Sequence, residues 1–231
     1  MESIDKVHGT FDKRQIDIKT VPSAVIKRLP RYHRYLGDLL RDGRLRISSA
    51  ELSKIMDVTA SQIRQDLNCF GGFGQQGYGY NISYLHSKIS ELLGVHQGFN
   101  AVIVGAGNLG RALAATHMFE RRGVNRLALF DTNPALIGTK IYGLPVYDVK
   151  ELYNFCINNK VDIGVLTVPK EAALEVTNRL AGAGVKGIWN FANMELRSPR
   201  EGVIVENIHL GDSLMTLCYE IKTLKEKEQG K

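Results

Sequence analysis

Apolar residues recur at three- and four-residue intervals near the start of the chain, after a polar stretch over residues 1–20. This spacing predicts an amphipathic helix that opens at Pro22-Ser23 and ends at Asp42-Gly43. Pro30 lies inside the pattern and is expected to kink the helix or move its start. The first twenty residues lack the apolar core of a signal peptide, so we expect a flexible tail on a cytoplasmic protein.

Two helix-start signals follow closely on one another. Ser48 with Glu51, and Thr59 with Gln62, each have the spacing of a capping box. They predict a short helix over 49–56, a tight turn, and then a second helix. Two short helices joined in this way are typical of a helix-turn-helix.

Glycines alternate with aromatic residues from 71 to 80, which indicates a tight two-stranded wing. The pattern as a whole predicts a winged helix-turn-helix domain over residues 21–97. The second helix should turn Ile63 and Leu67 inward and a polar face outward, toward phosphates or base edges. A helical subdomain without any nucleic-acid role is the alternative reading.

Charge favours the first of these readings. The formal net charge is +6, which alone is weak evidence for an anionic partner. Over residues 27–46, however, seven basic side chains stand against two acidic ones, directly before the helix-turn-helix pattern. The candidate DNA contacts are Arg28, Arg34, Ser61, Gln62, Arg64, Gln65, Asn68, Gln76 and Tyr78.

A buried parallel strand is predicted over 99–104, and it runs into a G-x-G-x-x-G turn followed by a helical stretch over 111–120. In such a turn the first glycine permits the tight bend, the second admits a pyrophosphate, and the third lets strand and helix pack closely. The helix start then offers unpaired N–H groups to phosphate. The turn comprises Gly105, Ala106, Gly107, Asn108, Leu109 and Gly110.

A second strand, over 126–130, ends in Asp131, which lies 21 residues after Gly110. A carboxylate at this spacing accepts hydrogen bonds from the adenosine ribose and repels a 2′-phosphate, so NAD(H) is favoured over NADP. A Rossmann-type domain that binds another nucleotide, or none, remains the alternative.

Strands and helices continue to alternate up to a last strand around 203–205, which predicts a Rossmann domain over 98–206. Ligands of such sheets bind at the carboxyl ends of the strands. The residues that follow two of these ends are candidates to border the nicotinamide, or are ordinary strand-to-helix turns: Thr167, Val168, Pro169, Asn190 and Phe191.

The tail over 207–231 contains a final helix with an apolar stripe from Leu210 to Leu224. A stripe of this kind must pack against something. Its partner is either the chain's own sheet or a second copy, to which the helix would pass as an exchanged arm of a two-fold dimer.

Other kinds of site are disfavoured. Cys69, Cys156 and Cys218 are far apart and form no C-x-x-C pair, so buried thiols are expected rather than disulfides or a zinc ribbon. The six histidines show no metal-ligand spacing, and no apolar run is long enough for a membrane span. We therefore expect neither a metal nor a membrane partner.

The order of these motifs resembles the bacterial redox-sensing repressor family Rex over about residues 21–224. The resemblance implies a homodimer that binds a palindromic operator when NAD⁺ predominates and releases it when NADH binds. It also implies that the C-terminal helix crosses into the partner subunit. The matching stretches lie within 21–36 and at 58–67, 77–80, 103–110, 166–169 and 190–192.

This sequence departs from the family pattern at several positions. The family has basic residues where Gln65 and Gln76 stand, and losing two cations weakens attraction to phosphates. It also has a switch of an Arg, a Tyr and an Asp. Arg34 matches the first of these, whereas Thr116 and His209 replace the other two. A regulator of the same fold with an altered redox response is therefore one alternative.

Two further alternatives remain. The first is a small NAD-dependent oxidoreductase, for which His117 and His209 are the only tempting bases. The second is a module for a different nucleotide such as coenzyme A, against which Asp131 argues. The repressor interpretation requires no catalytic residue.

Overall fold

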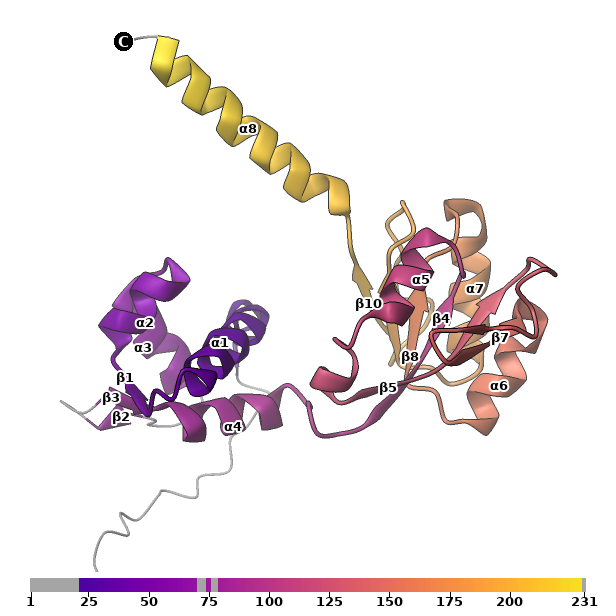
Figure 1. The fold of residues 1–231 in the computed structure, drawn as a ribbon, viewed down its shortest axis with the longest axis horizontal. Coiled ribbons are helices and arrows are strands. Elements are labelled where there is room, and N and C mark those ends of the chain that lie inside the picture. Colours follow the sequence, from indigo (N-terminus) through magenta and orange to yellow (C-terminus); the bar gives the residue numbers. More distant parts are fainter. Residues whose placement is uncertain (1–20, 70–73, 76–78, 230–231) are drawn as a thin grey trace, which may run out of the picture. The chain divides into compact units, whose positions relative to one another are not determined.

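The computed structural model describes residues 21–69, 74–75 and 79–229 (Figure 1). It divides into two compact units, Met1–Gly94 and Val95–Lys231. Gln76 and Tyr78 of the expected wing lie outside the described residues, as does the N-terminal stretch 1–20.

In its described residues, the first unit packs four helices beside a small antiparallel sheet with strand order β1-β3-β2. The helices are α1 (Ser23–Arg41), α2 (Ser49–Met56), α3 (Ala60–Asn68) and α4 (Ile82–Leu92), and the strands are β1 (Arg46–Ile47), β2 (Gly74–Gln75) and β3 (Gly79–Asn81). The winged helix-turn-helix class is confirmed, with β2 and β3 pairing as the wing strands. Neither α4 nor β1 was predicted.

Local capping explains where the two short helices begin. The Ser48 hydroxyl accepts the N–H of Glu51, whose carboxylate accepts the N–H of Ser48 in return. Thr59 caps α3 by accepting the N–H of Gln62. Each such cap stabilises a helix by about 1 kcal/mol.

Pro30 lies within α1 without shifting its start, because the helix begins at Ser23, as the spacing of the apolar residues predicts. The apolar face of α1 forms the centre of this unit's core. Tyr32 and Leu36 are fully buried there, together with Ile63 of α3 and Leu85 of α4.

The second unit is built on a seven-stranded sheet with order β10-β9-β8-β4-β5-β7-β6, parallel except where β6 joins β7. The strands are β4 (Phe99–Val104), β5 (Val124–Asp131), β6 (Lys140–Ile141), β7 (Leu144–Asp148), β8 (Ile163–Leu166), β9 (Gly187–Asn190) and β10 (Ile204–Asn207). The main helices between them are α5 (Asn108–Ala115), α6 (Leu152–Asn158) and α7 (Lys170–Gly182), as Figure 1 shows. The Rossmann class is confirmed.

Strand β4 lies at the point where the chain changes direction across the sheet. The chain proceeds from β4 to β5 and β7 on one side, and then returns to β8 on the other side of β4. Open α/β sheets bind ligands at the carboxyl ends of the strands that flank such a switch point. This topology directs attention to the residues that follow β4, β5 and β8.

Some predicted boundaries in this unit were wrong. The helix expected over 111–120 is α5, which ends at Ala115 because Thr116 is extended and its hydroxyl accepts the N–H of Met118. A short 3₁₀ turn over Glu120–Arg122 follows. The β6–β7 hairpin was not anticipated.

The final helix α8 (Leu210–Gln229) has no buried residue. Its large apolar side chains are half or more exposed at several positions, including Leu214, Leu217 and Tyr219. The chain's own sheet is therefore not the partner of this stripe. No helix within residues 21–229 that the structure describes is both long and apolar enough to cross a bilayer.

Candidate functional site

The glycine turn lies between β4 and α5, at the switch point of the sheet. Gly105 has φ +102°, and a Cβ there would stand 2.6 Å from the carbonyl oxygen of Thr167. A Cβ on Gly110 would collide with the carbonyl oxygen of Gly105. Both positions therefore require glycine, the first for its backbone angle and the second for close packing.

Gly107 differs from these two glycines, because a Cβ there would meet no atom within 4 Å. Its φ of −71° is also open to any residue. Packing within the described chain therefore does not require glycine at position 107. The absence of a side chain keeps open a space directly before the first turn of α5, where the backbone N–H groups of Asn108 and Leu109 have no earlier helical turn to bond.

Asp131 closes the other side of the turn. Its Oδ2 accepts the N–H of Ala106 at 2.6 Å, and its Oδ1 accepts the N–H of Asn133 at 2.8 Å. The carboxylate at the end of β5 is thus held against the glycine turn, where a ribose would lie beside a bound pyrophosphate. Arg111 adds a bond from its Nε to the carbonyl oxygen of Ala106.

The end of β8 is tied to the same turn. The Thr167 hydroxyl lies 2.8 Å from the Gly105 carbonyl oxygen and 3.1 Å from that of Val104. Thr167 thereby fixes the turn from the neighbouring strand, while Val168 is half-buried and Pro169 is exposed at the start of α7.

Asn190 does not suit a cofactor contact, because it is fully buried and all its polar atoms have internal partners. Its Nδ2 donates to the Met194 carbonyl and to Asn207 Oδ1, and its Oδ1 accepts the N–H of Ala192. We therefore correct this assignment: Asn190 shapes the loop after β9. Phe191 is half-buried and packs edge-on to Trp189.

The outer face of α3 matches the expected polar surface. Ser61, Arg64, Gln65 and Asn68 are exposed, and Gln62 is half-buried. Arg64 donates from Nη1 to the Ser49 hydroxyl at 3.1 Å and is itself exposed.

Arg28 is not placed for DNA, and this assignment is also corrected. Its Nε and Nη2 each lie 2.7 Å from an oxygen of Asp66, a side chain that is 1% exposed. Tyr32 and Gln62 also donate to Asp66, at 2.9 and 2.8 Å. Burial alone would raise the pKa of Asp66, but the bonds from Arg28, Gln62 and Tyr32 outweigh it and hold that pKa below its ordinary value.

Sequence reasoning missed Asp66, although a signal was present. Arg28 and Tyr32 are four residues apart and lie on one face of α1, so two donors point the same way. What the sequence could not show is that α3 would bring a carboxylate to them across 38 residues.

The three switch candidates are divided between the two units, with Arg34 in the first and Thr116 and His209 in the second. Arg34 is exposed on α1 with its guanidinium carbon 5.0 Å from the Tyr35 ring centre, and a hydrogen bond from Arg34 lowers the pKa of Tyr35. In the second unit, Thr116 ends α5. His209 lies just before α8, with its Nε2 2.9 Å from Glu195 Oε2.

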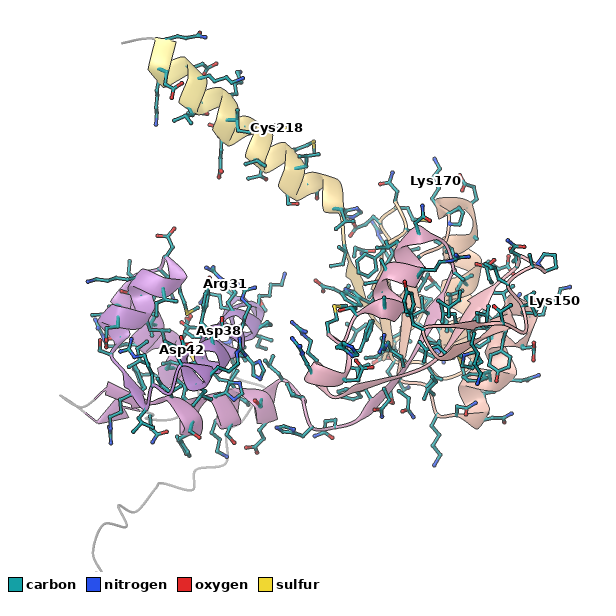
Figure 2. All side chains as sticks on the ribbon, viewed as in Figure 1. Arg31, Asp38, Asp42, Lys150, Lys170 and Cys218 are labelled. Carbon is teal, nitrogen blue, oxygen red and sulfur yellow. The ribbon has the colours of Figure 1, made fainter. Side chains whose placement is uncertain are left out.

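The cysteines are unpaired thiols, but only Cys156 is buried, and burial raises its pKa to about 12. Cys69 is half-buried and Cys218 is exposed on α8 (Figure 2), which corrects the expectation that all three are buried. Among residues 21–69, 74–75 and 79–229, no three His, Cys, Asp or Glu side chains are grouped as metal ligands would be.

Comparisons with known proteins agree with both halves of this geometry. A family model described as "Putative DNA-binding protein N-terminus" matches residues 20–68, and one described as "CoA binding domain" matches residues 96–194. A redox-sensing transcriptional repressor Rex from Clostridioides difficile is 56% identical over 88% of this chain and 97% of its own length. The chain belongs to the Rex family.

Two solved structures extend the comparison. RSP in complex with beta-NAD⁺ and operator DNA is 51% identical, with a TM-score of 0.83 over 91% of this chain and 98% of that one. RSP in complex with beta-NADH is 48% identical, with the same TM-score over 92% and 99%. Rex proteins of this kind are regulators, and both complexes are with the dinucleotide that the glycine turn and Asp131 suggest.

Proposed function

We propose that this chain is a transcriptional repressor that senses the NADH/NAD⁺ ratio, binding operator DNA when NADH is low and releasing it when NADH binds. The observation that carries the proposal is the glycine turn with Asp131 bonded to Ala106, joined in one chain to an exposed polar recognition helix. It acts where bacterial DNA lies, in the cytoplasm, as a regulator rather than an enzyme.

The residues present fit an adenine dinucleotide. Gly107 leaves room for a pyrophosphate, and the N–H groups at the start of α5 face that space with the positive end of the helix dipole. The Asp131 carboxylate would accept hydrogen bonds from the ribose hydroxyls and would repel a 2′-phosphate. Thr167, Val168, Pro169 and Phe191 follow strand ends at the same edge and would border the nicotinamide half.

The name of the matching family model raises coenzyme A as an alternative. Coenzyme A carries a 3′-phosphate on its adenosine ribose, and a carboxylate at Asp131 is poorly suited to a second negative charge there. Calorimetry with NADH, NADPH and coenzyme A separates the candidates. NADPH or coenzyme A binding as tightly as NADH would contradict the role given to Asp131.

The proposed DNA site comprises the outer face of α3, with Ser61, Gln62, Arg64, Gln65 and Asn68, together with Arg34 on α1. Gln76 and Tyr78 lie outside the described residues and stay candidates from the sequence. The helix N-terminus would contact base edges and the flanking residues would contact phosphates.

Two apolar surfaces support a homodimer. One is the exposed stripe of α8, and the other is a hollow of about 430 Å³ lined by Met118, Phe119 and Trp189, among other residues. A monomer would leave both in water, whereas an exchanged α8 would cover apolar surface on a second copy. A two-fold dimer presents two α3 helices, which suits a palindromic operator.

Thr116 and His209 replace the family's Tyr and Asp. The redox response is therefore the part of the proposal that depends most on residues particular to this chain. The decisive experiment first selects a duplex from random DNA and then titrates the complex with NAD⁺ and with NADH. Release at a much lower concentration of NADH than of NAD⁺ is expected. If NAD⁺ and NADH release the DNA at equal midpoint concentrations, the protein does not sense the redox state, and it is a DNA-binding regulator with an altered response.

An oxidoreductase is the second candidate, but no observation favours it. His209 is engaged with Glu195, and His117 is exposed on the segment after α5. Hydride transfer to a substrate at an ordinary enzyme rate would revive this reading.

A further inference from the structure

We propose that Asp66 is a positioning residue that fixes the side-chain amide of Gln62 with its oxygen outward, so that this oxygen accepts from an exocyclic amine of an operator base. The inference rests on the proposed DNA-binding function of α3. It deepens that function by naming the chemical group on the DNA that this position selects.

The carboxylate of Asp66 is saturated with donors. Its Oδ2 accepts from Arg28 Nε and Tyr32 Oη, and its Oδ1 accepts from Arg28 Nη2 and Gln62 Nε2. An ionised carboxylate has about four lone-pair sites, so these four bonds use all of them. Asp66 therefore offers nothing to water or DNA, and its role is internal.

This arrangement decides which end of the Gln62 amide points inward. The Arg28 guanidinium keeps Asp66 ionised, and an ionised carboxylate carries no hydrogen to donate. Only the nitrogen end of the amide can therefore bond to it, and the 2.8 Å contact must be Nε2 to Oδ1. The oxygen Oε1 is left as the end available to a ligand.

The position of Gln62 in the helix makes this orientation relevant to DNA. Gln62 is in the first turn of α3, where its backbone N–H is held by the Thr59 cap, and it is half-buried beside the exposed Ser61. The N-terminal residues of a recognition helix are those that contact base edges in the major groove.

The chemistry of the bases then defines the preference. An unconstrained glutamine bonds adenine with both ends, its oxygen to the N6 amine and its nitrogen to N7. Asp66 holds one hydrogen of the Gln62 nitrogen and leaves the other free, so what it excludes is the flipped amide, whose nitrogen would face the DNA and donate to a base carbonyl. The outward oxygen instead selects an exocyclic amine, which is N6 of adenine or N4 of cytosine. Loss of the amine, or its replacement by a carbonyl, should weaken binding.

The test uses the full-length protein, a selected duplex and NAD⁺. Each adenine of a half-site is replaced in turn by purine, which lacks the 6-amine, or by guanine paired with cytosine, which presents the O6 carbonyl in its place. Each cytosine is replaced by 2-pyrimidinone, which lacks the 4-amine. At one position, removing the amine should weaken binding about fivefold in the wild type, the effect of one hydrogen bond. In Gln62→Met that dependence should disappear.

Gln65→Met is the matched control, since it removes another glutamine of α3 and should leave the amine dependence at the Gln62 position intact. Asp66→Asn tests the positioning role, because asparagine can also donate and so releases the Gln62 amide. At the same base, this variant should discriminate less than the wild type between an amine and a carbonyl. Thermal melting establishes that each variant is folded.

The outcomes separate the two proposals. If the wild type binds no duplex under any condition, the proposed function itself fails. If it binds, but tolerates a carbonyl in place of the amine at the Gln62-dependent base, or if no base depends on Gln62, the inference about Asp66 is overturned while the repressor function stands. The Gln62→Met comparison decides this even if Asp66→Asn does not fold.

Discussion

Alanine at Gly107 should abolish most dinucleotide binding without destabilising the fold. A Cβ at this position meets no atom of the chain, and its φ of −71° suits alanine. Replacing glycine lowers the entropy of the unfolded chain, which stabilises by about 0.4–1 kcal/mol. Alanine is a poorer N-cap than glycine by a similar amount, so the two effects nearly cancel.

Binding should respond very differently. The methyl group would occupy the space through which a pyrophosphate approaches the backbone, and a hydrogen bond to a charged group is worth about 1.5–3 kcal/mol. The affinity for NADH should therefore fall roughly 10- to 100-fold, while Tm stays within about 3 °C of the wild type. Calorimetric titration and differential scanning calorimetry measure the two quantities.

Gly110→Ala is the matched comparison. Its Cβ would collide with the Gly105 carbonyl, so this variant should lose both NADH binding and thermal stability. Should Gly107→Ala bind NADH within about twofold of the wild type, the pyrophosphate does not lie where the turn suggests, and the assignment of the glycine motif is wrong.

Four other predictions follow from the same structure. Asp131→Ala should weaken NADH binding and reduce the preference for NADH over NADPH, because it removes a carboxylate that repels a 2′-phosphate. An unchanged ratio of the two affinities in calorimetry would contradict this. Gln65→Arg should tighten operator binding and steepen the slope of log K against log salt by about 0.9, unless the side chain faces away from phosphate. Leu217→Glu should give monomers in sedimentation experiments, and a persistent dimer would place the interface elsewhere. The pKa of Asp66 is depressed in the folded state, so its stabilising contribution is present above its unfolded value of about 4 and is lost as the pH falls through the folded value. Denaturant titrations of the wild type and of Tyr32→Phe should show a smaller acid-induced loss in the variant.

Local signals in the sequence predicted much of the fold. The caps at Ser48 and Thr59 placed α2 and α3 because a helix start depends on residues three positions apart. The strand before Gly105 and the carboxylate at Asp131 likewise placed the dinucleotide turn. Helix α4 was not predicted, although Asn81 caps it. The glycine-rich stretch directly before it indicates strands, and this hid the start of a helix.

What could not be predicted depends on contacts between distant segments. Asn190 lies at the carboxyl end of a strand, where a cofactor contact is expected. Its side-chain amide instead donates to Asn207 and to the Met194 carbonyl. Arg28 belongs to a basic cluster, yet a carboxylate 38 residues away turns it inward. In both cases the residue type and its position suggested a ligand, and only tertiary pairing revealed an internal partner.

The attachment of α8 has a mechanical consequence. His209, directly before the helix, contacts Glu195, whose carboxylate also accepts a hydrogen bond from Asn207 Nδ2 at 3.1 Å. None of the twenty residues of α8 itself is buried. A helix of that length measures about 30 Å, so a tilt of roughly 10° at the root moves its tip by about 5 Å. A small rearrangement of the segment around Glu195 would therefore displace the far end of α8 much more than its start.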